Sequence, residues 1–235
     1  MRTSAGKLGL VLSMAFAAIA HADVVTGTSN GTFNNPIGDA GLIDSGAGTN
    51  QFIWGDPDGF GVGANSVTFT GSSINSFTDT PFAVGAFAYF NGTTAIGTNA
   101  TGVEMDVALN LTAPTGINQV FDFQLAITTT TNGGVDPAQD ADIVSLTNTY
   151  SMQTFVANGN TYTLLLLGFV NPNVTGGFVD GPGNSNFHVY EGATGTADLQ
   201  AEITLAANVP EPYSVVLLGT LLVGVAVSLR RKLVS

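Results

Sequence analysis

The sequence predicts an all-β protein, an antiparallel β-sandwich of jelly-roll type, from two observations. Apolar and polar residues alternate with a period of two through much of the chain, and clusters of Gly, Asn, Asp, Pro and Ser separate the runs. Such alternation gives a strand one apolar and one wet face, as in an antiparallel sheet packed on one side. Because the runs show no fixed-period repeat, two packed sheets are favoured over a solenoid or propeller.

Individual runs support this prediction in chain order. Clean alternation occurs at residues 103–111, 121–127 and 197–205. Residues 162–170 are apolar almost throughout, so we expect a central strand covered on both faces. Residues 82–90 are similarly apolar, and Gly85 within them suggests a β-bulge.

Charge is segregated along the chain. All five Lys and Arg lie within residues 2–7 and 230–232, whereas all seventeen Asp and Glu lie within residues 23–211. The central segment therefore has a formal charge of −17, which would repel nucleic acids and anionic lipids and excludes nucleic-acid binding. The absence of Cys excludes thiol catalysis and thiolate metal sites, and the absence of Lys from this segment excludes Schiff-base chemistry there.

The first 22 residues are expected to form a secretory signal peptide. They contain Arg2 and Lys7, then an apolar run at residues 8–20, then the small-x-small pair Ala20 and Ala22. The apolar run is too short for a comfortable membrane span. We predict cleavage after Ala22, which makes residues 23–206 an exported domain.

The last 29 residues, 207–235, have a three-part pattern. Pro210, Glu211 and Pro212 precede the uncharged run 213–229, and a basic end, Arg230, Arg231 and Lys232, follows it. As a helix the run would be roughly 25 Å long, near the lower limit for crossing a bilayer. We expect a transmembrane helix whose basic end stays in the cytoplasm.

This order of motif, span and basic end resembles the PEP-CTERM sorting signal, which an exosortase reads in certain Gram-negative bacteria. The resemblance implies processing by signal peptidase and exosortase, a transient inner-membrane intermediate, and a mature protein at the cell surface or outside the cell. An ordinary tail anchor with an incidental Pro-Glu-Pro motif is the alternative.

The central domain resembles the choice-of-anchor type K domain. The resemblance lies in residues 52–57 (FIWGDP), 66–71 (SVTFTG), 82–85 (FAVG) and 89–92 (YFNG). It implies an exported bacterial β domain over nearly all of residues 23–206, and it carries no catalytic residues.

A calcium site is a hypothesis for Asp136, Asp140 and Asp142, three acids within seven residues that follow a Gly-Gly turn. Ca²⁺ takes six to eight oxygen ligands, which such a loop can supply. The spacing differs from that of an EF-hand loop, and solvated turn residues are the alternative. Asp56 and Asp58 form a second, weaker candidate.

Enzymatic function finds little support in the sequence. Glu104 and Asp106 share one strand face about 7 Å apart, within the range of glycosidase carboxylate pairs, but the face is wet and lacks an aromatic cleft. His188 is the one histidine of the exported domain, and we expect a structural role for it. Trp54 is a possible glycan-stacking residue, although core packing fits its apolar neighbours better.

We therefore predict a non-enzymatic, exported protein of the cell surface or extracellular matrix, associated with biofilm or exopolysaccharide. No cofactor is expected apart from the calcium hypothesis. The alternative is a carbohydrate-binding module or glycoside hydrolase acting on exopolysaccharide, with Trp54, Tyr89 or Tyr190 as its aromatic contacts.

Overall fold

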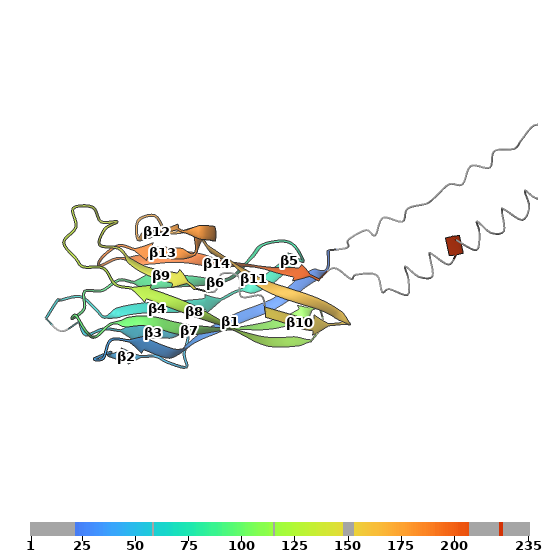
Figure 1. Cartoon of the computed structure of the whole chain (residues 1–235), viewed down its shortest axis with the longest axis horizontal. Helices are drawn as coiled ribbons and strands as arrows, with labels where there is room; N and C mark the ends of the chain where they lie inside the picture. Colours follow the sequence, from blue (N-terminus) through green and yellow to red (C-terminus); the bar gives the residue numbers. More distant parts are fainter. Residues whose placement is uncertain (1–21, 58, 115, 148–152, 207–220, 223–235) are drawn as a thin grey trace, which may run out of the picture.

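The computed structural model describes residues 22–57, 59–114, 116–147, 153–206 and 221–222. Within them the chain forms fourteen β-strands in two seven-stranded antiparallel sheets, so the predicted antiparallel β-sandwich is confirmed (Figure 1). The predicted signal peptide, apart from Ala22, lies outside the described residues, as do Asp58, the Pro-Glu-Pro motif and the basic end. In the described ranges, no helix has the length and hydrophobicity needed to cross a membrane.

The first sheet, sheet A, has the order β12-β13-β9-β8-β7-β1-β5. Its strands are β1 (Val24–Gly38), β5 (Ser73–Phe77), β7 (Ala100–Ala113), β8 (Ile117–Thr128), β9 (Asp142–Leu146), β12 (Gly177–Asp180) and β13 (Asn186–Val189). A 3-10 turn, η1 (Pro182–Asn184), joins its last two strands.

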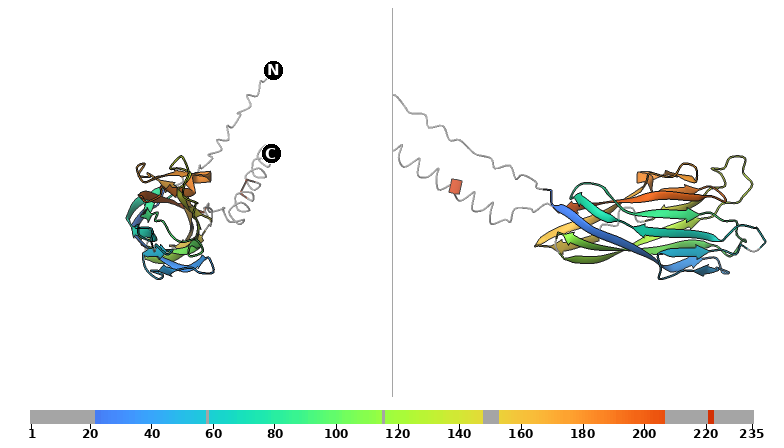
Figure 2. Two further views of the ribbon diagram at one scale, coloured as in Figure 1. Left: turned by 90° about the vertical axis from the view of Figure 1, so that its left-hand side faces the viewer. Right: turned by 180° about the vertical axis from the view of Figure 1, so that it is seen from behind.

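The second sheet, sheet B, has the order β10-β11-β14-β6-β4-β3-β2. Its strands are β2 (Asp44–Ser45), β3 (Gln51–Trp54), β4 (Asn65–Gly71), β6 (Phe82–Phe90), β10 (Gln153–Ala157), β11 (Asn160–Val170) and β14 (Thr194–Leu205). The chain crosses between the sheets repeatedly, for example from β4 to β5 and from β13 to β14. Seen end-on, the two sheets curl around a common core (Figure 2).

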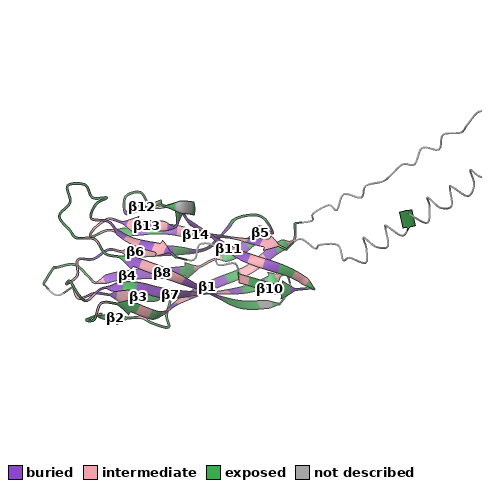
Figure 3. Ribbon diagram, in the orientation of Figure 1, coloured by how far each residue is buried: buried purple, intermediate pink, exposed green. Residues whose placement is uncertain are grey.

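The core contains the apolar side chains predicted from the alternation. From Val103 to Leu111 in β7 and from Phe121 to Ile127 in β8 every second residue is buried, and the same holds for most of β14 (Figure 3). At the centre, Phe87 contacts the rings of Phe33, Phe69 and Phe169 edge-on, with centroids 6.2, 5.6 and 5.3 Å away. These contacts connect strand β1 of sheet A to three strands of sheet B, and edge-to-face pairs add stability beyond the area they bury.

The ring of Phe69 lies between two glycines. A Cβ atom on Gly31 of β1 would come within 2.4 Å of this ring, and one on Gly85 of β6 within 2.2 Å. The register between β6 and β14 shifts at this point, because Leu199 pairs with Gly85 and the next residue, Gln200, pairs with Ala83. The β-bulge predicted at Gly85 is therefore confirmed, and the missing side chains make room for the ring.

The prediction for residues 162–170 was wrong in one respect. They form most of β11, which lies between β10 and β14, but its residues alternate between buried and half-buried. Leu165 and Leu167 belong to the half-buried set. The described chain forms two layers, so the outer face of β11 borders solvent, and a run of leucines does not by itself indicate a second covering layer.

The first and last residues of the domain lie at one end of the sandwich. The Tyr162 hydroxyl donates to Asp23 Oδ2 at 2.7 Å, and Tyr162 pairs with Leu205 in the sheet. The Asp79 amide donates to the Ile203 carbonyl at 2.9 Å, which joins the same region to the β5–β6 turn. The β6–β7 and β8–β9 loops lie at the opposite end (Figure 1).

Candidate functional site

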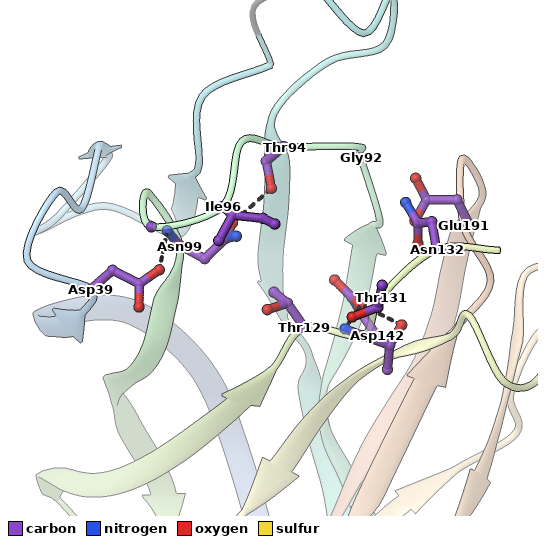
Figure 4. Close-up of a pocket in the computed structure, with 12 residues that line it drawn as sticks. Asp39, Gly92, Thr94, Ile96, Asn99, Thr129, Thr131, Asn132, Asp142 and Glu191 are labelled. Carbon is purple, nitrogen blue, oxygen red and sulfur yellow. Dashed lines mark hydrogen bonds between the residues drawn. The ribbon is translucent and has the colours of Figure 1, made fainter. Parts of the chain in front are cut away.

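A pocket of about 440 Å³ opens at the loop end of the sandwich (Figure 4). The two ends of the domain lie at the opposite end of the sandwich (Figure 1). Its lining comes from five places in the chain, each next to the end of a strand. These are Asp39 after β1, residues 92–99 between β6 and β7, residues 129–132 after β8, Asp142 at the start of β9, and Glu191 after β13. The antiparallel arrangement brings these strand ends together.

Asp142 is the most buried acid in the pocket, with 4% of its surface exposed. Its Oδ1 accepts hydrogen bonds from the Thr130 amide at 2.7 Å and the Thr130 hydroxyl at 3.1 Å. Its Oδ2 accepts one from the Tyr89 hydroxyl at 3.3 Å. Burial raises the pKa of Asp142 to about 6, although the hydrogen bonds from Thr130 act in the opposite direction. Burial, together with the negative charge of Asp142, also raises the pKa of Tyr89.

Hydrogen bonds fix the β6–β7 loop, which forms one wall of the pocket. The backbone amide of Asn99 donates to Asp39 Oδ2 at 3.0 Å, and its side-chain Oδ1 accepts from the Thr94 hydroxyl at 2.7 Å. The Gly92 amide donates to Asn65 Oδ1 at 2.8 Å. Because this loop is tied to β1 and β4, the wall is formed before any ligand arrives.

The pocket is electronegative. Asp39, Asp142 and Glu191 contribute three carboxyl groups, and residues 23–211 contain no Lys or Arg to neutralise them. The charge on Glu191 contributes to the raised pKa of Asp142, and the Thr93 hydroxyl donates to Glu191. The pocket therefore favours positively charged ligands and disfavours anions.

Two buried polar atoms at this end of the core have no hydrogen-bond partner, Trp54 Nε1 and Asn91 Oδ1. Trp54 pairs with Asn65 across β3 and β4, and Asn91 immediately follows β6.

Only 1% of the surface of Trp54 is exposed, and its ring stacks on Phe52 with centroids 5.3 Å apart. The core-packing interpretation of Trp54 is thus confirmed, and its ring offers no surface for a sugar. Tyr89 is also buried, whereas Tyr190 is half-buried beside Phe178.

The three acids of the predicted calcium loop do not converge. Asp136 Oδ1 accepts from the Ala138 amide at 3.0 Å, and Asp140 Oδ1 accepts from the Gly134 amide at 2.8 Å, so both stabilise local turns. Only Asp142 lines the pocket. This corrects the calcium hypothesis for the loop, because acids that are close in sequence here serve three different backbone segments. In the weaker candidate, the backbone amide of Asp56 donates to the Thr98 hydroxyl oxygen at 3.0 Å.

The structure instead brings Glu104 and Asp106 together with Asp122 on the outer face of sheet A. Their carboxylate oxygens lie within 4.8 Å of one another, and within the described ranges no other such group of three acids or histidines occurs. Asn34 donates to Asp106 at 2.7 Å, and Gln124 donates to Glu104 at 3.0 Å. Burial raises the pKa of Asp106 against the lowering effect of Asn34, and the neighbouring acids raise it further.

This acidic group faces outward from regular strands, where strand pairing places Asp106 directly opposite Asp122. Amide donors already contact Glu104 and Asp106. The group is chemically able to attract a cation, but its geometry is that of a sheet surface and not of a glycosidase cleft.

His188 occupies a structural position. Its Nε2 lies 2.8 Å from Asp180 Oδ1, and its ring stacks on Phe178 with centroids 4.3 Å apart. Slight burial tends to raise the pKa of Asp180, but hydrogen bonds from His188 and Asn186 lower it overall. These contacts join β12 to β13 at the edge of sheet A.

Sequence reasoning identified Asp142 and missed Asp39, Thr94, Asn99 and Glu191. A partial signal was present in the four threonines at 128–131, which precede the acidic loop. No protein-family model matches the chain, and a search of curated proteins finds no match. The two resemblances noted in the sequence therefore remain expectations.

Proposed function

We propose that this protein is an exported, non-enzymatic protein of the cell surface or extracellular matrix, associated with biofilm or exopolysaccharide. In this proposal a signal peptide exports it, the 207–235 segment holds it briefly in the inner membrane, and an exosortase processes that segment. The observation that carries the proposal is the polarity of the domain. Asp23 and Leu205, near the two ends of the domain, both contact Tyr162 at one end, and the pocket opens at the other.

This polarity suits a protein presented from a surface. Strand β1 has fifteen residues, so it spans roughly 45 Å between the two ends. A domain tethered through the residues that follow β14 would hold its pocket that far from the tether. The acid-only composition of the domain also supports an exterior location, since such a surface would be repelled by anionic lipids and would stay soluble.

We also propose that the sandwich is of jelly-roll type and corresponds to a choice-of-anchor domain. Repeated crossing of the chain between two curled antiparallel sheets is what a jelly-roll-like sandwich has, and an exported β domain is what the choice-of-anchor resemblance implies.

Processing is testable with the full chain in a bacterium that makes an exosortase. Mass spectrometry of the exported protein should find an N-terminus at Asp23 and no peptide from residues 213–235. Glu211→Ala should leave the protein in the inner-membrane fraction, because the sorting motif is broken. Glu202→Ala, the matched control on β14, should be exported normally. Full-length protein that begins at Met1 and stays in the cytoplasm would contradict the proposal.

A glycan-binding module is the second candidate, and the loop-end pocket favours it. Hydroxyl, amide and carboxyl groups line this pocket, and these are the groups that exchange hydrogen bonds with sugars. This version of the candidate does not use Trp54, whose ring is buried.

A further inference from the structure

We infer that the loop-end pocket binds a protonated amine carried on a hydroxylated, sugar-sized molecule, that is, an amino-sugar unit with a free amino group. This inference deepens the glycan-binding candidate and rests on the proposed function for its setting among extracellular polymers. Charge, the spacing of the carboxyl groups and the neutral lining each support it.

The charge of the pocket selects a cation. Asp39, Asp142 and Glu191 line one cavity, and residues 23–211 contain no Lys or Arg that could balance them. An ammonium group would supply this balance through charge-assisted hydrogen bonds, which are about twice as strong as neutral ones. Ligands with carboxylate, sulfate or phosphate groups would be repelled.

The spacing of the carboxyl groups favours an organic cation over a bare metal ion. Calcium requires six to eight oxygens at about 2.3–2.6 Å, which means that the acids must converge on one point. The carboxylate oxygens of Asp39, Asp142 and Glu191, all of them described residues, do not come within 4.8 Å of one another as a group of three. They are distributed around a cavity of about 440 Å³, which lies in the size range of small-molecule sites.

The neutral part of the lining suits the rest of an amino sugar. Thr94, Thr129 and Thr131 contribute hydroxyl groups, and Asn99 and Asn132 contribute amides, all of which can exchange hydrogen bonds with sugar hydroxyls. Ile96, whose side chain is fully exposed at the rim, offers an apolar contact for the C–H face of a ring. Figure 4 shows these groups arranged around the cavity, between the β6–β7 and β8–β9 loops.

Ligand binding should also change the ionisation of the buried Asp142 carboxyl group. An ammonium beside Asp142 would favour its ionised form, so binding should release a proton near pH 6. Affinity for the amine should therefore increase as the pH rises from 5 to 7. A neutral sugar would show little of this dependence.

The test is calorimetric titration of the full chain, held in a polyoxyethylene detergent, with glucosamine, N-acetylglucosamine, glucose and Ca²⁺ as separate probes. Glucosamine should bind at least about tenfold more tightly than the two neutral sugars, because each loses a charge-assisted hydrogen bond. Glu191→Gln and Asp39→Asn should each weaken glucosamine binding about tenfold. Glu202→Gln on β14 makes the same chemical change outside the pocket and should leave binding unchanged.

Several results would overturn the inference. Equal affinity for glucose and glucosamine would mean a neutral polyol site, and binding of Ca²⁺ alone would mean a metal site. Absence of binding at millimolar glucosamine, or an unchanged affinity in Glu191→Gln protein with parental melting temperature, would also refute it. Because binding is measured on purified protein, it can fail while export succeeds, and the reverse, so the two proposals are judged separately.

Discussion

Replacing Asp142 with Asn tests the electrostatics of the pocket directly. The ordinary pKa of an aspartate is 3.8, and in the folded protein that of Asp142 is raised to about 6, chiefly by burial. The folded state therefore holds the proton more tightly than the unfolded state does. Its contribution to stability is fully present below about pH 4 and is lost as the pH rises through 6.

The size of this effect follows from the difference of about two pKa units. At about 1.4 kcal/mol per unit, the full contribution is roughly 3 kcal/mol, of which about 2 kcal/mol is lost between pH 4 and pH 7. In Asp142→Asn protein, the amide oxygen can still accept from the Thr130 amide, and the amide nitrogen can donate to the Tyr89 oxygen. The variant therefore loses the titration and keeps most of the hydrogen bonds.

Urea unfolding at pH 4 and pH 7 measures the prediction. The free energy of unfolding of Asp142→Asn minus that of the parent should be about 2 kcal/mol larger at pH 7 than at pH 4. For a domain of this size, that corresponds to about 4–8 °C in melting temperature. Asp44→Asn removes an exposed acid on β2 and serves as the control, for which we expect no comparable change. A stability difference between parent and Asp142→Asn that stays constant with pH would refute the reasoning.

Three further predictions concern the fold, each measured by the urea midpoint at pH 7. Gly31→Ala should destabilise by about 1–3 kcal/mol, because the new methyl would come within 2.4 Å of the Phe69 ring. Asp122→Asn should stabilise by about 0.5 kcal/mol, because it removes a like charge directly opposite Asp106. Tyr162→Phe should cost about 1 kcal/mol, because it removes a hydrogen bond that ties down the start of β1.

Each of these predictions can fail in its own way. A Gly31→Ala protein as stable as the parent would mean that the ring has room to move. Destabilisation by Asp122→Asn would mean that the acidic group is held by an attraction, such as a bound cation, and not weakened by repulsion. An unchanged midpoint in Tyr162→Phe would mean that the terminal hydrogen bond contributes little in water.

The sequence predicted the architecture because alternation is a local property. Every second residue from Val103 to Leu111 in β7 and from Phe121 to Ile127 in β8 is buried as expected, and the bulge appears at Gly85. The covering of β11 was not predictable in this way, since Leu165 and Leu167 look the same in sequence whether half-buried or fully covered. Their exposure depends on how many layers the whole chain forms.

The candidate site was less predictable because its residues come from distant parts of the chain. Asp39 and Glu191 are isolated acids in sequence, and only the antiparallel arrangement of strand ends brings them to one pocket. Conversely, Asp136 and Asp140 are near neighbours of Asp142 but bind separate backbone amides. The approach of Asp122 to Asp106 depends on strand register, which the sequence pattern alone does not specify.

The position of β14 has a mechanical consequence. It runs from the loop end to the end where the domain stops, with β11 on one side and β6 on the other. A load applied between a ligand in the pocket and a tether beyond Leu205 would act along the strand, nearly perpendicular to its ladder of hydrogen bonds. Both ladders would then be sheared together and not opened one bond at a time, so the domain should resist extension strongly in this direction.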